Sequence, residues 1–184
     1  MMPKLVSLVA TVLLLSACQH ATVRDAESPR SRVSVGSSFT LHTALIVPVG
    51  HARVFLQGGV VVAKGEVDLY RPHCNVEVRS VSAGDSHIEP DTFVVTVVVE
   101  DEEDIVDWKE SPRYASLLAT ADDSVVITIT RFVRHTLQSE RQPEVMHITC
   151  HGGFAEPWQV DYPSISDIRQ VLGKLITLKL HNTD

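Results

Sequence analysis

The chain has little positive charge, few aromatic residues and no sequence signature of catalysis. Its 184 residues include 16 lysines and arginines against 23 aspartates and glutamates, and aromatic residues make up 5%. An acidic balance disfavours nucleic acid and a broad electrostatic hold on anionic lipid. There is no phosphate-binding glycine loop and no Gly-x-Ser-x-Gly elbow of hydrolases. We therefore expect no enzyme activity, no cofactor and no nucleic-acid partner.

Long apolar runs are also missing, because no stretch reaches the roughly 20 residues that a membrane-spanning helix needs. The most apolar stretch, Leu5 to Leu15, follows a single positive charge at Lys4. A short apolar run behind a basic start is typical of an export signal peptide. The stretch ends in Leu15-Ser16-Ala17-Cys18, with small residues directly before a cysteine.

This tetrapeptide resembles the lipobox of bacterial lipoproteins, and the resemblance covers residues 1–18 only. It implies that residues 1–17 are removed and that Cys18 carries the lipid, where two or three acyl chains give a stable membrane anchor. Gln19, where an aspartate would signal inner-membrane retention, implies the periplasmic side of the outer membrane, with the inner membrane as the lesser alternative. The competing interpretation is an ordinary secretory signal with an incidental cysteine.

Beyond the signal, the sequence predicts a polar tether over residues 18–38 and one β-rich domain over residues 39–184. Stretches rich in β-branched residues, several of them with period-two alternation, predict the strands. Gly58-Gly59 predicts a tight hairpin, because both glycines tolerate positive φ. We expect a mainly β fold, an antiparallel sandwich or partly open barrel. A single curved sheet with a helix over one face is the alternative. The expected strands cover residues 39–47, 52–57, 60–63, 66–70, 73–81, 92–108, 124–136 and 144–151.

Two helices are expected among these strands. Residues 114–121 predict a short helix in a connection. Near the end of the chain, Ser164 and Asp167 form a capping-box pattern, apolar residues follow at helical spacing, and Gly173 supplies the stop. A last strand is expected over residues 174–180.

Cys74 and Cys150 are the two cysteines left once Cys18 is lipidated. In an oxidising compartment such a pair predicts a disulfide, with a mixed cysteine–histidine metal site and free thiols as alternatives. Neighbouring side chains of a strand point to opposite faces. Cys74 should therefore share a face with Val76 and Val78, and Cys150 with Ile148 and Met146. The adjacent histidines should face the other way.

Those histidines, His73, His147 and His151, form the candidate cluster for a transition metal, although we assign no metal site. The alternative is that they are solvated on a polar sheet face. Glu77 and His147 are the one pair to inspect for acid–base chemistry. The acidic run of residues 100–104 predicts a solvated strand edge. His151-Gly152-Gly153 resembles the oxyanion loop of esterases, but without the nucleophile elbow it predicts a turn.

The sequence therefore predicts a non-enzymatic lipoprotein of the cell envelope, an accessory or protein-interaction domain. Its membrane attachment would come from the lipid at Cys18, and its partner would be another envelope protein. The second hypothesis is a small-ligand or transition-metal binding module.

Overall fold

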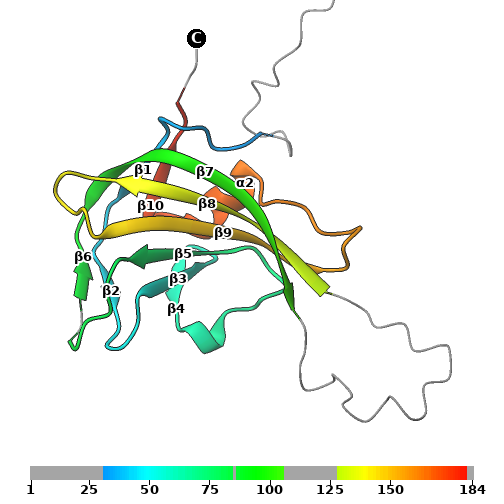
Figure 1. Ribbon diagram of the computed structural model, residues 1–184, viewed down its shortest axis with the longest axis horizontal. Helices are drawn as coiled ribbons and strands as arrows, with labels where there is room; N and C mark the ends of the chain where they lie inside the picture. The colour runs from blue at the N-terminus through cyan, green and yellow to red at the C-terminus, as the bar shows by residue number, and fades with distance from the viewer. Residues whose placement is uncertain (1–30, 85, 106–127, 182–184) are drawn as a thin grey trace, which may run out of the picture.

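The computed structural model describes residues 31–84, 86–105 and 128–181, and within these ranges the fold is mainly β. An eight-stranded antiparallel sheet has the order β10-β1-β7-β8-β9-β5-β3-β4, and β2 pairs with β6 as a separate ribbon (Figure 1). The sheet strands are β1 (Ser38–Leu41), β3 (Arg53–Gln57), β4 (Val60–Val62), β5 (His73–Val78), β7 (Asp91–Ile105), β8 (Thr128–Gln138), β9 (Val145–Ala155) and β10 (Ile176–Lys179). The ribbon consists of β2 (Leu45–Val47) and β6 (Ser86–Ile88).

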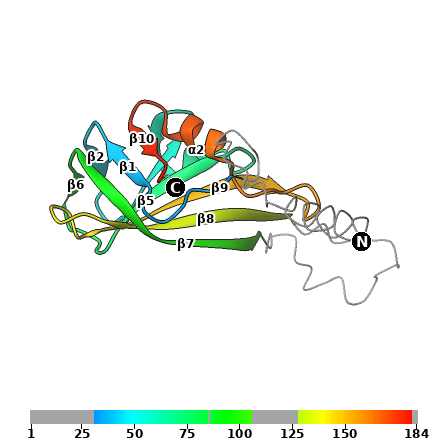
Figure 2. The ribbon, with the colours of Figure 1, turned by 90° about the horizontal axis from the view of Figure 1, so that it is seen from above.

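The sheet curls into a half-barrel, and one short helix, α2 (Ile165–Leu172), lies against it (Figure 2). The helix contacts β10 at one end of the strand order and β5 and β3 toward the other. Its four apolar side chains are all buried, and the β3–β4 hairpin is tied to it because the Gly59 amide donates to the Val171 carbonyl at 2.9 Å. The prediction of a mainly β, partly open barrel with one C-terminal helix is confirmed. No helix in the described ranges has the length and apolar character to cross a membrane.

The start of α2 follows the predicted capping box. The Asp167 amide donates to the Ser164 hydroxyl at 3.1 Å, and the Ser164 amide donates to the Asp167 carboxylate at 2.9 Å. These two bonds satisfy amides that the first helical turn leaves without a partner. The helix ends at Gly173, whose φ of 55° brings the chain close against Gly59.

Ser164→Ala should lower the free energy of unfolding by about 1 kcal/mol, because it removes the side-chain acceptor of the cap. Urea unfolding followed by circular dichroism measures this. Ser166→Ala is the matched control, since Ser166 is exposed in the same helix, and it should cost nothing. Equal losses in the two variants would contradict the role of the cap.

Several strand boundaries differ from the prediction. The expected strand 39–47 is two strands, because the chain breaks at His42, whose amide donates to the Leu175 carbonyl, and β2 then pairs with β6 instead of joining the large sheet. The expected strand 66–70 is wrong. A 3-10 helix, η1 (Lys64–Glu66), is followed by a turn in which Gln57 bonds the backbone of Asp68. The strand β6 was not predicted.

The N-terminal boundary also differs, because Val33 is buried in the core and the Gly36 amide donates to the Val95 carbonyl. The last residues of the expected tether therefore belong to the domain. The hairpin at Gly58-Gly59 is confirmed, with φ values of 59° and 84°. The signal segment, Cys18 and the expected helix of residues 114–121 lie outside the described residues.

The acidic run lies on β7, where β1 pairs only with Asp91–Val94. Residues 100–104 therefore pair with β8 on one side and have no described strand on the other. The side chains of residues 100–103 and Asp104 are exposed. Glu100 and Glu102 form ion pairs with Arg32 and Arg131 at 3.0 and 3.5 Å. The predicted solvated edge is confirmed.

Candidate functional site

Cys74 and Cys150 lie directly opposite each other on β5 and β9 and form a disulfide, as predicted. Both are buried on the side of the sheet that carries the core, together with Val76 and Ile148. One detail of the face assignment is wrong. The register shifts between Glu77 and Val78, which places Val145 opposite Val78 and buries it in the core in place of Met146.

The opposite side of these strands carries three cross-strand rows of side chains, which we call the outer polar face. Each row takes one residue from β8, β9 and β5, and on β3 Arg53 lies opposite Glu77 and Phe55 lies opposite Asn75. The charged row is Thr136, His147, Glu77 and Arg53; the donor row is Arg134, Thr149 and Asn75; the aromatic row is Phe132, His151 and His73. Strands lie about 4.8 Å apart, and same-face neighbours along a strand lie about 6.6 Å apart, so the rows form a compact array.

The aromatic row contains a stacked histidine pair. The ring centroids of His73 and His151 are 4.7 Å apart, and the rings are 3° from parallel. The Phe132 ring lies 5.2 Å from His151, and His73 donates through Nδ1 to the Arg71 carbonyl at 3.1 Å. The prediction that these histidines face away from the cysteines is confirmed for His73, which lies directly opposite His151.

His73 is nevertheless buried, so the expectation of solvated histidines is wrong for this residue. The reason is the glycine pair after His151, which continues β9 and does not form the expected turn. At Gly153, with φ of 98°, an added Cβ would lie 2.9 Å from the Tyr70 carbonyl oxygen. An added Cβ at Gly152 would collide with the Asp161 carbonyl oxygen. The glycines thus let two loops pack closely over this end of the strands.

Burial controls the protonation of these imidazoles. Desolvation is the main cause that lowers the pKa of His151 to about 4, and electrostatic interactions with His73, Arg53 and Arg134 lower it further. Desolvation also lowers the pKa of His73, although its bond to the Arg71 carbonyl opposes the shift. Both rings are therefore neutral at pH 7.

His147 belongs to a different row from the stacked pair. It lies opposite Glu77, four residues from His151 along β9, a separation of about 13 Å. The three histidines therefore do not form one cluster, and the described ranges contain no group of three metal-ligating side chains able to hold an ion. Glu77 itself forms an ion pair with Arg53 at 3.3 Å. Burial lowers the pKa of His147, and the Glu77 charge only partly opposes this.

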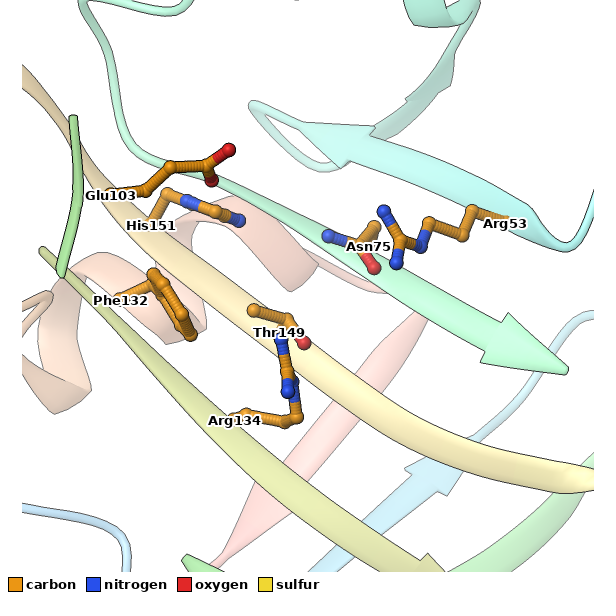
Figure 3. Close-up of a pocket in the computed structure, with 7 residues that line it drawn as sticks. All are labelled: Arg53, Asn75, Glu103, Phe132, Arg134, Thr149 and His151. Atoms are coloured by element: carbon orange, nitrogen blue, oxygen red, sulfur yellow. The ribbon is translucent and has the colours of Figure 1, made fainter. Parts of the chain in front are cut away.

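A small pocket of about 60 Å³ lies on the outer polar face (Figure 3). Its centre is the donor row, with Phe132 and His151 on one side, Arg53 on the other, and Glu103 from β7 at the rim. Figure 3 shows the Arg134 guanidinium extending toward Thr149, and the amide nitrogen of Asn75 on the side of β9.

Three polar atoms of the pocket lining are buried and have no hydrogen-bond partner in the part of the chain that the structure describes. They are Asn75 Oδ1, Arg134 Nε and His151 Nδ1. Asn75 is only 5% exposed. A buried polar group without a partner costs about 1–3 kcal/mol, and such groups are rare in native proteins. The arrangement is therefore suited to binding polar groups that enter from outside the protein.

The two arginines of the pocket differ in their ion pairing. Arg53 is paired with Glu77, whereas no carboxylate in the described ranges lies at ion-pair distance from Arg134. The Arg134 guanidinium carbon lies 5.4 Å from the centre of the Phe132 ring. Arg134 is thus a partly buried cation beside an aromatic ring, without an anionic partner in residues 31–84, 86–105 and 128–181.

Sequence reasoning identified His73, His147, His151 and Glu77 but missed Arg134, Asn75, Thr149 and Phe132. Asn75 and Thr149 could have been predicted from the sequence, because each adjoins a disulfide cysteine and must face the opposite side of the sheet. The positions of Arg134 and Phe132 depend on the register of β8, which no local pattern indicates.

Comparison with known proteins gives no relative to guide the assignment. No protein-family model, no curated protein and no solved structure matches this chain.

Proposed function

We propose that this chain is an exported, lipid-anchored protein of the bacterial cell envelope, whose β domain is a non-enzymatic interaction module. The observation that carries the proposal is the Cys74–Cys150 disulfide, which is buried in the core. Structural disulfides persist in oxidising compartments and are rare where glutathione keeps thiols reduced. A folded domain built around such a bond fits a protein that leaves the cytoplasm.

The lipid anchor is the second part of this proposal. It is supported by the lipobox-like sequence that ends at Cys18 and by the lack of a second long apolar segment in the sequence. Two or three acyl chains on Cys18 would suffice for stable attachment. Gln19 after the cysteine favours the periplasmic side of the outer membrane, where the domain would meet a partner protein of the envelope.

Labelled palmitate should be incorporated into the full chain when it is expressed in a Gram-negative bacterium, and Cys18→Ser should abolish the label. The protein should sediment with outer-membrane vesicles in a sucrose gradient, and the serine variant should leave that fraction. A chain with Cys74 and Cys150 both changed to serine is the control and should keep the label. An unlabelled wild-type chain would refute the anchor.

The second candidate function is a small-ligand binding module, and the pocket on the outer polar face is the observation that favours it. Three buried polar atoms of its lining have no partner among the residues that the structure describes, and one of them belongs to Arg134, which has no counter-ion there. The histidines do not converge, so the geometry supports an organic ligand over a transition metal.

A further inference from the structure

We propose that the pocket on the outer polar face binds a single carboxylate group, held by the guanidinium of Arg134 and the side chains of Thr149 and Asn75. This inference rests on the second candidate function, that of a ligand-binding module. The carboxylate would come from a small organic acid or from the C-terminal end of a polypeptide.

Arg134 supplies the charge. A guanidinium is planar and presents its N–H groups as a fork that matches the two oxygens of a carboxylate. The guanidinium carbon lies 5.4 Å from the centre of the Phe132 ring, within the range of a cation–π contact. The Nε–H is buried and has no acceptor among the described residues. An acceptor pair entering the pocket would satisfy it and would neutralise the unpaired cation.

The donor row supplies the remaining contacts. Thr149 lies opposite Arg134 on one side and opposite Asn75 on the other, so the hydroxyl and the amide stand at the same level of the sheet as the guanidinium. Adjacent strands are about 4.8 Å apart, so these groups span about 10 Å. Figure 3 shows all three side chains bordering the same space. The Asn75 residue is 5% exposed, and its amide nitrogen is the group that could donate to a carboxylate, because its buried Oδ1 is an acceptor.

The other groups around the pocket favour one negative charge over two. Glu103 lines the rim and repels a dianion, and Arg53 is already engaged by Glu77. His151 adds no positive charge near neutral pH, since burial lowers its pKa to about 4. A volume of about 60 Å³ accommodates a group of the size of a carboxylate. A carboxylate meets these conditions better than a phosphate.

Titration of the ¹⁵N-labelled full chain in detergent micelles tests the proposal. Sodium acetate should give saturable shifts of the Arg134 Nε–H and Asn75 side-chain signals at pH 7. Inorganic phosphate at the same ionic strength should bind at least about tenfold more weakly. A tetrapeptide with a free C-terminus is compared with its amidated form. If the free peptide binds tenfold tighter than acetate, the source is a polypeptide end; equal affinities indicate a free acid.

Arg134→Gln should weaken acetate binding by about tenfold or more, because it removes the charged donor and keeps a polar side chain. Arg79→Gln is the matched control, since Arg79 is exposed and does not line the pocket. Glu103→Gln is a second test that does not depend on the folding of Arg134→Gln, because Glu103 is exposed and its replacement should leave the fold intact. It should raise phosphate affinity toward that of acetate.

Three outcomes would overturn the carboxylate site: no saturable shift with acetate or the free peptide, equal losses in Arg134→Gln and Arg79→Gln, or no effect of Glu103→Gln on the preference for acetate over phosphate. None of them bears on palmitate labelling. The site can therefore fail while the envelope anchor stands, and the reverse also holds.

Discussion

Replacement of both Cys74 and Cys150 by alanine should lower the free energy of unfolding by about 4 kcal/mol. The bond joins residues 76 positions apart, and the chain-entropy model gives a constraint of this size for a loop of that length. A domain of this kind has a total stability of about 5–15 kcal/mol, so the loss is a large fraction of it. Urea unfolding followed by circular dichroism, extrapolated to water, measures the difference.

The double variant is preferred because a single replacement would leave one thiol free for exchange. Cys18→Ser is the control and should keep the wild-type stability, since that cysteine takes no part in the bond. Wild-type protein reduced with dithiothreitol should unfold at the same urea concentration as the double variant. A loss below about 1 kcal/mol would show that the bond constrains the unfolded chain far less than its position implies.

Acidification from pH 7.5 to pH 4.5 should destabilise the domain, with His135 alone contributing about 2.5 kcal/mol. Its residue is fully buried, its Nδ1 lies 3.3 Å from the Ile148 carbonyl oxygen, and its ring contacts Phe39 edge-on. Desolvation lowers its pKa from 6.5 to about 4, and the bond to the carbonyl only partly opposes this.

The sign follows from which state takes up the proton. Above pH 6.5 the ring is neutral in both the folded and the unfolded chain, so its contribution is constant. Between pH 6.5 and 4 the unfolded chain binds a proton at this ring and the folded chain does not, so the free energy of unfolding decreases as the pH is lowered. Burial lowers the pKa of His151 to the same value, so it acts in the same direction over the same window.

His135→Leu separates the contribution of His135 to the pH dependence of stability from that of the other titrating groups. The difference in unfolding free energy between pH 7.5 and pH 4.5 should shrink by about 2.5 kcal/mol relative to wild type. His87→Leu is the matched control, because His87 is exposed on β6, and it should leave the difference unchanged. Equal slopes for wild type and His135→Leu would contradict burial of the neutral ring.

Local patterns in the sequence were enough for much of the fold. Alternation and β-branched runs indicated most of the strands, and Gly58-Gly59 gave the hairpin. The spacing of Ser164 and Asp167 gave the start of α2. Where polar side chains bond the backbone, as Gln57 does with Asp68, a β-like composition formed a turn instead. The errors thus arose where contacts from distant residues outweighed local preference.

For the candidate site, the sequence by itself determined that the neighbours of Cys74 and Cys150 would face the other side of the sheet, and it favoured a disulfide between the two cysteines over a metal site or free thiols. Both follow from cysteine number and from the two-residue period of a strand, which are local properties. Only the tertiary structure decided that Arg134, Thr149 and Asn75 form one row, and that His147 is separated from the stacked His73 and His151. Cross-strand register decides this, because it depends on bulges, on loop packing at Gly152 and Gly153, and on hydrogen bonds between residues far apart in the chain.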